Sequence, residues 1–379
     1  MLTDKANDQL LVDSFEGGAI DFIKLPVDKL VFKARIKTAL AAREYEKYLE
    51  KRVEARIADL QSINVKLTRE VNERKQKEKA LHRSKRELLY TNRAYERFVP
   101  RDFLRHLNKK NIIDVALGNN VEQKMSVLFA DIRSFTTISE SMTPEETFKL
   151  LNSYLSQIGP LVRSHRGFID KYIGDAIMAL FDVEADDAVK GAIAMFHKLT
   201  EYNTGRKKAG YQPLQIGIGI NTGDLMLGTI GEHNRMEGTV ISDAVNLASR
   251  LEGLTKFYGA PLLISEYTYH HLKDASQYTI RYVDRVQVKG KMKPVVIYAV
   301  MDGETLDVLE KKVATAAIFE QGWKSYQARE FKEAISLFQQ CVTQVPEDKT
   351  ARLYLERCQI FLKEGCDEEW DGVTHLDTK

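Results

Sequence analysis

Hydrophobic and polar residues follow three successive patterns along the chain, and each predicts a different kind of structure. Between Ala41 and Arg97 the chain has neither glycine nor proline, and apolar residues recur at a seven-residue spacing. This spacing predicts a long helix that pairs with a parallel second copy as a coiled coil. The residues that follow it are Val53, Leu60, Leu67, Leu81 and Leu88, with Ile57 and Val71 in a second row.

This apolar seam is incomplete. Arg74 interrupts the first row, and the other second-row positions are the polar residues Asn64, Glu78 and Lys85. Polar residues at these positions weaken a coiled coil, so we expect a loosened middle. A single solvated helix with a chance leucine spacing is the alternative, because a face rich in lysine and arginine fits both structures.

From about Met125 to Met301, short apolar runs alternate with amphipathic stretches. The pattern predicts a helix beginning near Pro144 and further helices over 187–202 and 242–256. Two apolar runs, 214–223 and 225–231, predict a hairpin. Other strands are expected over 125–131, 168–172, 176–181, 279–290 and 294–301. The sequence therefore predicts an α+β domain with one largely antiparallel sheet.

The C-terminal pattern is helical. Part of the tetratricopeptide spacing is present, in Trp323, Tyr326, Ala334, Phe338 and Pro346. One repeat and a half cannot form a solenoid, so we expect this tail to dock on the central domain. A short cap that binds another protein is the alternative.

Composition narrows the class of protein. At 379 residues, with 44% hydrophobic and 29% charged residues, the chain is typical of about two or three folded domains. A net charge of +2 gives no reason to expect a nucleic-acid partner. Apolar runs fall short of the roughly 18 residues of a membrane span. Three cysteines without zinc-ligand spacing indicate a reduced, cytoplasmic setting.

Two carboxylates are the first candidates for chemistry. Asp131 ends a predicted strand, and Asp175 lies in a tight turn between two others. Either residue alone usually caps a helix or completes a turn. If their strands are neighbours, however, both carboxylates reach one edge of the sheet, where they could hold two Mg²⁺ or Mn²⁺ ions. The segment after Asp131 begins a helix whose backbone N–H groups suit a phosphate.

Four motifs carry a family resemblance. They read VLFADIRSFTTISESMTPEE, FIDKYIGDAIMALF, GTVISDAVNLASRLE and VKGK, in that order. Together they resemble the catalytic domain of class III nucleotidyl cyclases. The resemblance implies a ferredoxin-like domain that forms a cyclic nucleotide from a nucleoside triphosphate, as a homodimer with two sites at the interface.

The resemblance also implies roles for the two aspartates and their neighbours. Asp131 and Asp175 match the ligands of two divalent metal ions, assisted by the backbone carbonyl of Ile132. Phe135 and Thr136 match positions that hold the triphosphate through backbone amides. One metal lowers the pKa of the ribose 3′-hydroxyl and the other neutralises the leaving phosphates, so a dedicated protein base is not needed.

A second set of residues is expected to reach the same site from the other protomer. By resemblance, Asn246 orients the ribose, Arg250 neutralises charge on the α-phosphoryl oxygens, and Lys289 contacts phosphate. Asn246 and Arg250 lie four residues apart, which places them on one face of a helix. Dimerisation is then a condition of activity.

Lys171 and Thr239 match the pair that selects adenine in this family. The lysine donates to ring N1, and the hydroxyl accepts from the exocyclic amine. Guanine presents a donor at N1 and an acceptor at O6, so the lysine opposes it. The expected reaction is therefore that of an adenylate cyclase, from ATP to cyclic AMP. A guanylate cyclase and a catalytically silent nucleotide-binding or scaffolding domain are the alternatives.

The remaining segments complete the expected domain order. Residues 17–43 resemble the last strand and helix of a response-regulator receiver domain, although Leu25 stands where that family has lysine before Pro26. We therefore expect a receiver remnant at 1–43, whose input is an upstream partner or a missing receiver segment. Four segments are expected to follow it: a coiled-coil signalling helix at 44–97, a transducer linker at 98–124, the catalytic domain at 125–303 and the tetratricopeptide-like tail at 304–379.

Overall fold

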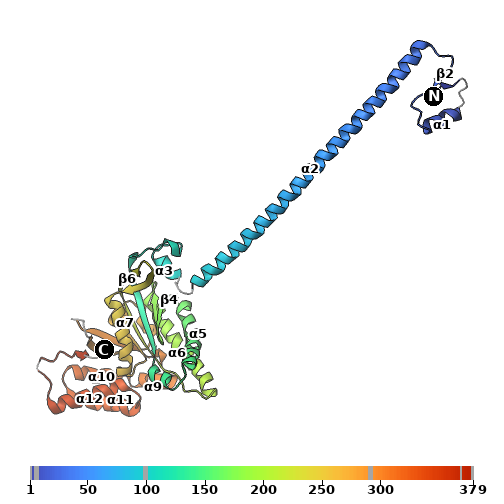
Figure 1. Ribbon diagram of the computed structural model, residues 1–379. Helices are drawn as coiled ribbons and strands as arrows, with labels where there is room; N and C mark the ends of the chain where they lie inside the picture. The colour runs from blue at the N-terminus through green and yellow to red at the C-terminus, as the bar shows by residue number, and fades with distance from the viewer. Residues whose placement is uncertain (1, 4–7, 97–100, 289–292, 368, 377–379) are drawn as a thin grey trace. The chain divides into compact units, whose positions relative to one another are not determined.

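The computed structural model describes residues 2–3, 8–96, 101–288, 293–367 and 369–376 (Figure 1). The chain divides into two compact units, Met1–Ala94 and Tyr95–Lys379. Each unit is described separately. Within the described residues, none of the helices combines the length and the apolar character needed to cross a membrane.

The first unit is dominated by one long helix. Two short strands, β1 (Leu2–Thr3) and β2 (Ile23–Lys24), pair in parallel, and α1 (Asp8–Glu16) lies between them in the chain. Helix α2 then runs from Lys29 to Tyr95 without a break. The predicted continuous helix is thus confirmed, and it begins earlier than the heptad pattern does.

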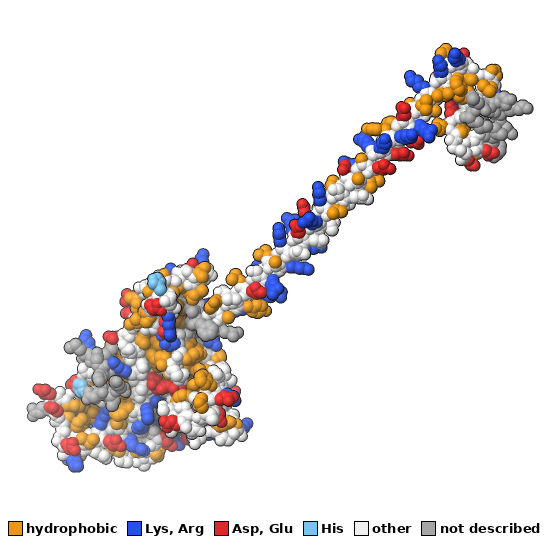
Figure 2. Space-filling model, viewed as in Figure 1, with side chains coloured by type: hydrophobic (Ala, Val, Ile, Leu, Met, Phe, Trp, Pro, Cys, Tyr) orange, Lys and Arg blue, Asp and Glu red, His pale blue; other side chains and the backbone are white. Residues whose placement is uncertain are grey.

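Helix α2 has no buried residue among those described. Its heptad side chains are exposed, with Val53 at 55% and Leu81 at 70%, and Figure 2 shows hydrophobic and charged side chains mixed along it. Pairs four residues apart, such as Arg69 with Glu73, support the helix locally. Pairing with a second copy remains a prediction, as does the resemblance of the preceding segment to a receiver domain.

In the described residues of the second unit, nine strands form one mixed sheet. Eight of them follow the order β11-β9-β10-β8-β6-β3-β5-β4, and β7 pairs with β6. Neighbours are antiparallel except β6 with β8 and β11 with β9. The bounds are β3 Asn120–Ile132, β4 Gly167–Ile173, β5 Ala176–Phe181, β6 Ile216–Glu232, β7 Arg235–Ile241, β8 Leu262–Ser265, β9 Ile280–Val288, β10 Val295–Val300 and β11 Thr374–Leu376.

Helices cover both faces of this sheet. Alternation along β3 sends Leu128 and Ala130 toward α5 (Pro144–Ser164) and α6 (Ala185–Lys208), and sends Val127 and Phe129 to the other face. That second face is covered by α3 (Arg101–His106), β7 and α7 (Asp243–Tyr258). Figure 1 shows α7 and the α5–α6 pair on opposite sides of the strands. The predicted α+β class is confirmed.

One predicted hairpin is wrong. Apart from Leu214 and Gln215, which precede it, the two runs lie in a single long strand, β6. The hairpin follows this strand, where Glu232 pairs with Arg235 across the turn to β7. Gly219, inside this strand, allows a close approach of α7. A Cβ at Gly219 would lie 2.2 Å from the backbone nitrogen of Glu252. Strand β7 was absent from the sequence-based prediction.

The helical tail docks on the sheet, as predicted. Its helices are α9 (Leu306–Ala314), α10 (Ala316–Gln327), α11 (Phe331–Gln344) and α12 (Lys349–Glu364). Arg281 on β9 forms a buried double hydrogen bond with Asp348, at 2.6 and 3.0 Å. The Tyr354 hydroxyl donates to the Val283 carbonyl at 2.7 Å. Resemblance to a tetratricopeptide repeat remains a prediction.

The tail also reaches the end of α7. Thr350 donates its hydroxyl to the Tyr258 carbonyl at 2.8 Å, and the Lys349 ammonium donates to the Lys256 carbonyl at 2.9 Å. These carbonyls belong to the last turn of α7, where helical partners are missing. Further along the chain, β11 adds a parallel strand beside the end of β9.

Candidate active site

Asp131 and Asp175 meet at one edge of the sheet. Asp131 lies next to last in β3, and Asp175 follows Gly174, whose φ of 65° makes the tight turn between β4 and β5. Strands β3 and β5 are neighbours, so the turn lies beside the end of β3. The Ile132 backbone N–H donates to the Asp175 carboxylate at 3.3 Å. The structure therefore brings these predicted residues together.

The electrostatics of this pair favour a cation. Burial, then the Asp175 carboxylate and the charge of Glu252, raise the pKa of Asp131 to about 7. A divalent ion would remove this mutual repulsion, and carboxylate and carbonyl oxygens suit Mg²⁺ or Mn²⁺. Among the described residues, no group of three or more His, Cys, Asp or Glu side chains is placed to hold a metal. The Ile132 carbonyl, water and substrate oxygens would have to complete the coordination.

Two neighbours of the aspartates were not singled out from the sequence. Tyr154 on α5 is fully buried, and burial together with both carboxylates raises the pKa of its hydroxyl. Arg133 turns toward α7, where it pairs with Glu252 at 3.4 Å and donates to Thr255. In the sequence, Tyr154 looks like any buried residue of an amphipathic helix. Its proximity to the aspartates follows from the packing of α5 on the sheet.

Phe135 and Thr136 begin the short helix α4 (Phe135–Glu140). The residue before them, Ser134, takes a left-handed conformation with φ 55°, which turns the chain sharply after β3. Phe135 packs against the core beneath α5 and α6, while Thr136 is exposed. The first backbone N–H groups of α4 therefore follow Asp131 closely in the chain.

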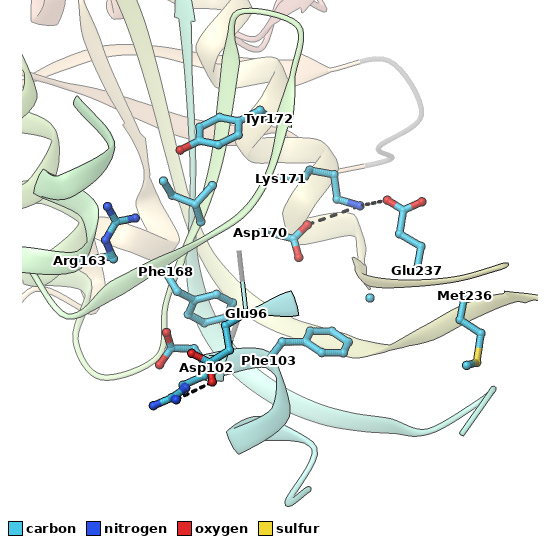
Figure 3. A pocket seen from close by; sticks show the side chains of 13 residues that line it. Glu96, Asp102, Phe103, Arg163, Phe168, Asp170, Lys171, Tyr172, Met236 and Glu237 are labelled. Carbon is cyan, nitrogen blue, oxygen red and sulfur yellow. Dashed lines mark hydrogen bonds and ion pairs between the residues drawn. The ribbon is translucent and has the colours of Figure 1, made fainter. Parts of the chain in front are cut away.

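Lys171 and Thr239 also come together. The Lys171 ammonium, on β4, donates to the Thr239 hydroxyl at 2.9 Å and to the Glu237 carboxylate at 3.0 Å. Figure 3 shows Lys171 between Asp170 and Glu237. Glu237 was not singled out from the sequence, although it lies two residues before Thr239 on β7. Its contact depends on the approach of β7 to β4, which the sequence does not reveal.

Asp170, Lys171 and Glu237 line a pocket of about 680 Å³. Its apolar wall includes Phe103, Phe168 and Met236, and Lys171 and Glu237 lie on its polar side (Figure 3). Apolar rings with a few directed polar groups are typical of a site for a flat organic ligand. A purine base has this character.

Asn246 and Arg250 form a separate group on α7. The helix begins at Asp243, capped by the Ser242 hydroxyl, which accepts from the Ala244 N–H at 2.7 Å. Asn246 is exposed and Arg250 half-buried, one turn apart. Within the described part of the chain, the Arg250 guanidinium has no hydrogen-bond or ion-pair partner, and neither residue bonds to the aspartate pair. Lys289 lies outside the described residues.

Residues 119–302 match the family described as Adenylate and Guanylate cyclase catalytic domain. These residues form a cyclase catalytic domain. The cyclase domain contains both aspartates, the Lys171–Thr239 pair and helix α7. It begins one residue before β3 and ends just after β10.

Known proteins similar to this chain include two named adenylate cyclases. "Adenylate cyclase, terminal-differentiation specific" of Dictyostelium discoideum is 38% identical over 268 residues, 69% of this chain and 12% of that protein. "Adenylate cyclase" of Anabaena cylindrica is 43% identical over 227 residues, 58% of this chain and 45% of that protein. The chain thus spans less than half the length of either relative.

A solved structure, the adenylyl cyclase CyaB from P. aeruginosa, is 36% identical to this chain. The match covers 48% of this chain and 95% of the chain in that structure, with a TM-score of 0.44.

Proposed function

We propose that this chain is an adenylate cyclase that converts ATP to 3′,5′-cyclic AMP and pyrophosphate. The observation that carries the proposal is the 2.9 Å hydrogen bond from Lys171, which lines the 680 Å³ pocket, to Thr239. The similarity to two proteins named adenylate cyclase supports it.

Hydrogen-bond chemistry at this contact favours adenine. The Thr239 oxygen accepts from Lys171 and retains a lone pair for the exocyclic amine of adenine. The ammonium is a donor, which suits the unprotonated N1 of adenine and opposes the N1–H of guanine. A guanylate cyclase is the less favoured alternative on this ground.

Asp131, Asp175 and the Ile132 carbonyl are proposed to hold two divalent metal ions. When bound, such ions lower the pKa of the ribose 3′-hydroxyl and offset the charge of the triphosphate. The two carboxylates would bind these ions and orient them. Backbone N–H groups of Phe135 and Thr136 are proposed to hold phosphate oxygens. The raised pKa of Asp131 supports this role, because the pair is poised to exchange a proton for a cation.

The second half of the site is proposed to come from a partner copy. Among the described residues, Asn246 and Arg250 on α7 form no hydrogen bond or ion pair with the aspartates of their own chain, and Arg250 has no counter-charge. In a homodimer, Arg250 would neutralise charge on the α-phosphoryl group, Asn246 would orient the ribose, and Lys289 would contact phosphate. The exposed heptad residues of α2 support pairing of two chains.

We also infer a ferredoxin-like core and the domain order expected from the sequence. The succession β3, α5, β4, β5, α6, β6, with strand order β6-β3-β5-β4, supports that core. The segments are proposed as 1–43 receiver remnant, 44–97 signalling helix, 98–124 linker, 125–303 catalytic domain and 304–379 tail. Free thiols at Cys341, Cys358 and Cys366 support a cytoplasmic setting.

Product analysis tests the proposed activity. The purified chain is incubated with ATP or GTP and with Mn²⁺ or Mg²⁺, and the products are separated against cyclic AMP and cyclic GMP standards. Cyclic AMP from ATP, with little product from GTP, is the expected result. Cyclic GMP as the main product would overturn the base assignment, and no product from a verified dimer would favour the silent-domain alternative.

A further inference from the structure

The tail of the chain holds the last residue of α7 at two points. Thr350, on α12, donates its hydroxyl to the Tyr258 carbonyl at 2.8 Å. The Tyr258 hydroxyl donates to the Asp284 carboxylate on β9 at 2.7 Å, and Arg357 of α12 donates to the same oxygen at 2.7 Å. Figure 1 shows the helices of the tail beside this end of α7. Both the main chain and the side chain of Tyr258 are therefore tied to α12.

These links lie in the interior of the protein. The side chains of Asp284 and Arg357 are 2% and 15% exposed, and Thr350 is buried as well. Hydrogen bonds to a charged group are stronger than neutral ones, and a buried carboxylate that loses a donor is costly. The position of the end of α7 therefore depends on the docking of α12.

The start of α7 is anchored differently. The Ser242 hydroxyl donates to the Asp224 carbonyl at 2.8 Å, and the Asn221 side chain donates to the Ala244 carbonyl at 3.0 Å. Asp224 and Asn221 belong to β6. The sheet of the cyclase domain thus holds the first turn of α7, and the tail holds the last turn.

Asn246 and Arg250 lie between these two anchors. The residues that follow them, Leu247 and Leu251, are buried in an apolar cluster against which Leu353 of α12 also packs. Within the described part of the chain, the Arg250 guanidinium has no hydrogen-bond or ion-pair partner. Its place is therefore set by the position of the helix and not by a bond of its own.

We propose that Thr350 and Arg357 of the tail are positioning residues for Arg250, which act by fixing the C-terminal end of α7. A continuous helix carries a shift at one end to the residues along its length, because its backbone hydrogen bonds link successive turns. The inference rests on the proposed function, because it requires Arg250 to act at a site completed by the aspartates of a partner copy. Neither tail residue need touch the nucleotide.

Two substitutions loosen the end of α7 with little change in side-chain shape. Thr350→Val removes the hydroxyl that bonds to the Tyr258 carbonyl. Tyr258→Phe removes the hydroxyl that bonds to Asp284 and keeps the buried ring. Arg357→Met cuts the second link directly, but it leaves the buried Asp284 carboxylate without its cation and can unfold the tail. Tyr258→Phe therefore tests that link if Arg357→Met does not fold.

The kinetic constants with ATP are measured below the unfolding temperature of every variant. Thr350→Val and Tyr258→Phe should each lower kcat by roughly tenfold, because a small misplacement of a group that acts in the transition state is costly. KM for ATP should stay within about twofold, since the base and metal contacts are unchanged. Wild-type kcat in both variants would overturn the inference.

The matched control is Arg352→Met, on the same helix as Thr350 and Arg357. The Arg352 side chain is exposed and donates to the Pro346 carbonyl, away from α7. Its loss should leave both kcat and KM unchanged. A control that lowers kcat as much as Thr350→Val does would show a general effect of damage to α12 and would overturn the inference.

Mixed dimers show which half of the site the tail serves. Each heterodimer is purified through two different N-terminal affinity tags. Paired with an Asp131→Ala chain, a Thr350→Val chain supplies its aspartates to a site whose α7 is wild type, so about half of wild-type activity is expected. Paired with an Arg250→Ala chain, its own loosened α7 must serve the one remaining site, and activity should be roughly tenfold lower than in the first pair.

The outcomes separate this inference from the proposed function. If the heterodimer of Asp131→Ala and Arg250→Ala is inactive, the sharing of sites between chains fails, and this inference fails with it. If that heterodimer is active while Thr350→Val gives equal activity with both partners, the inference alone is overturned. Such equal activities would assign the tail a purely structural role.

Discussion

Ile132 donates its backbone N–H to the carboxylate of Asp175 across 3.3 Å. This bond ties the end of β3 to the turn between β4 and β5. It holds Asp175 beside Asp131, whose pKa is raised by burial and by that neighbour. Two negative groups are thus kept together by the fold at a cost in stability, as expected at a site for cations.

Asp175→Asn should abolish most of the activity while the fold persists. The substitution removes one of two charged metal ligands, so we expect a loss of at least about a hundredfold in cyclic AMP formation. The unfolding temperature in metal-free buffer should be equal or higher, because the repulsion with Asp131 is gone. Asp224→Asn, at an exposed position of β6, is the control. Retained activity with either metal would count against the two-metal assignment.

Mixing two inactive chains should restore activity if each site is shared. An equal mixture of Asp131→Ala and Arg250→Ala chains forms about half heterodimers, each with one intact site, so about a quarter of wild-type activity is expected. A mixture of Asp131→Ala and Asp175→Ala should recover none, because both lesions fall in the same half-site. No recovery from proven Asp131→Ala/Arg250→Ala heterodimers would contradict sites shared between chains.

Asp170 should make the stability of the fold fall between about pH 4 and pH 6. Burial raises the pKa of its carboxyl to about 6, against the attraction of Lys171. The folded state therefore holds this proton to higher pH than the unfolded chain does, and stability decreases as the pH rises through that window. Asp170→Asn should stabilise the chain at pH 7 by about 1–3 kcal/mol and flatten this slope. Parallel pH profiles of unfolding free energy for both chains would contradict the assignment.

The buried pair of Arg281 and Asp348 should be a main support of the tail. Their side chains are 7% and 1% exposed, and removing one partner leaves an uncompensated buried charge. Asp348→Ala should lower the free energy of unfolding by about 3–5 kcal/mol, measured with denaturant. Glu320→Ala breaks the exposed pair with Lys324 and should cost less than about 1 kcal/mol. Equal effects of the two substitutions would show that the tail is held by its apolar contacts instead.

Much of the fold follows from local pattern. The alternation along β3, the Pro144 helix start and the tight turn at Gly174 are short-range signals, and all three occur in the structure as expected. The hairpin expected over 214–231 is wrong because β6 continues through Asp224, which pairs with Lys124 of β3. That pairing joins segments far apart in the chain, so the local pattern does not reveal it.

Residues of the candidate site could be predicted where a single sequence motif contains them. They could not be predicted where a contact depends on two segments that are distant in the sequence. Recognisable motifs contain Asp131, Asp175, Lys171 and Thr239. In the structure, the end of β3 that carries Asp131 is bonded to Asp175 through Ile132, and Lys171 is bonded to Thr239. Glu237 has no such signal. Its contact with Lys171 depends on the approach of β7 to β4, which long-range packing sets.

The docked tail has a consequence for how the chain can be shortened. Strand β11 pairs with the last residues of β9, and the Tyr354 hydroxyl donates to the Val283 carbonyl in the middle of that strand. Without residues 304–379, the outer side of β9 would present unpaired N–H and C=O groups to other molecules. A chain cut at the end of the cyclase domain should therefore self-associate through strand addition, and its loss of soluble protein would be mistaken for a loss of catalysis.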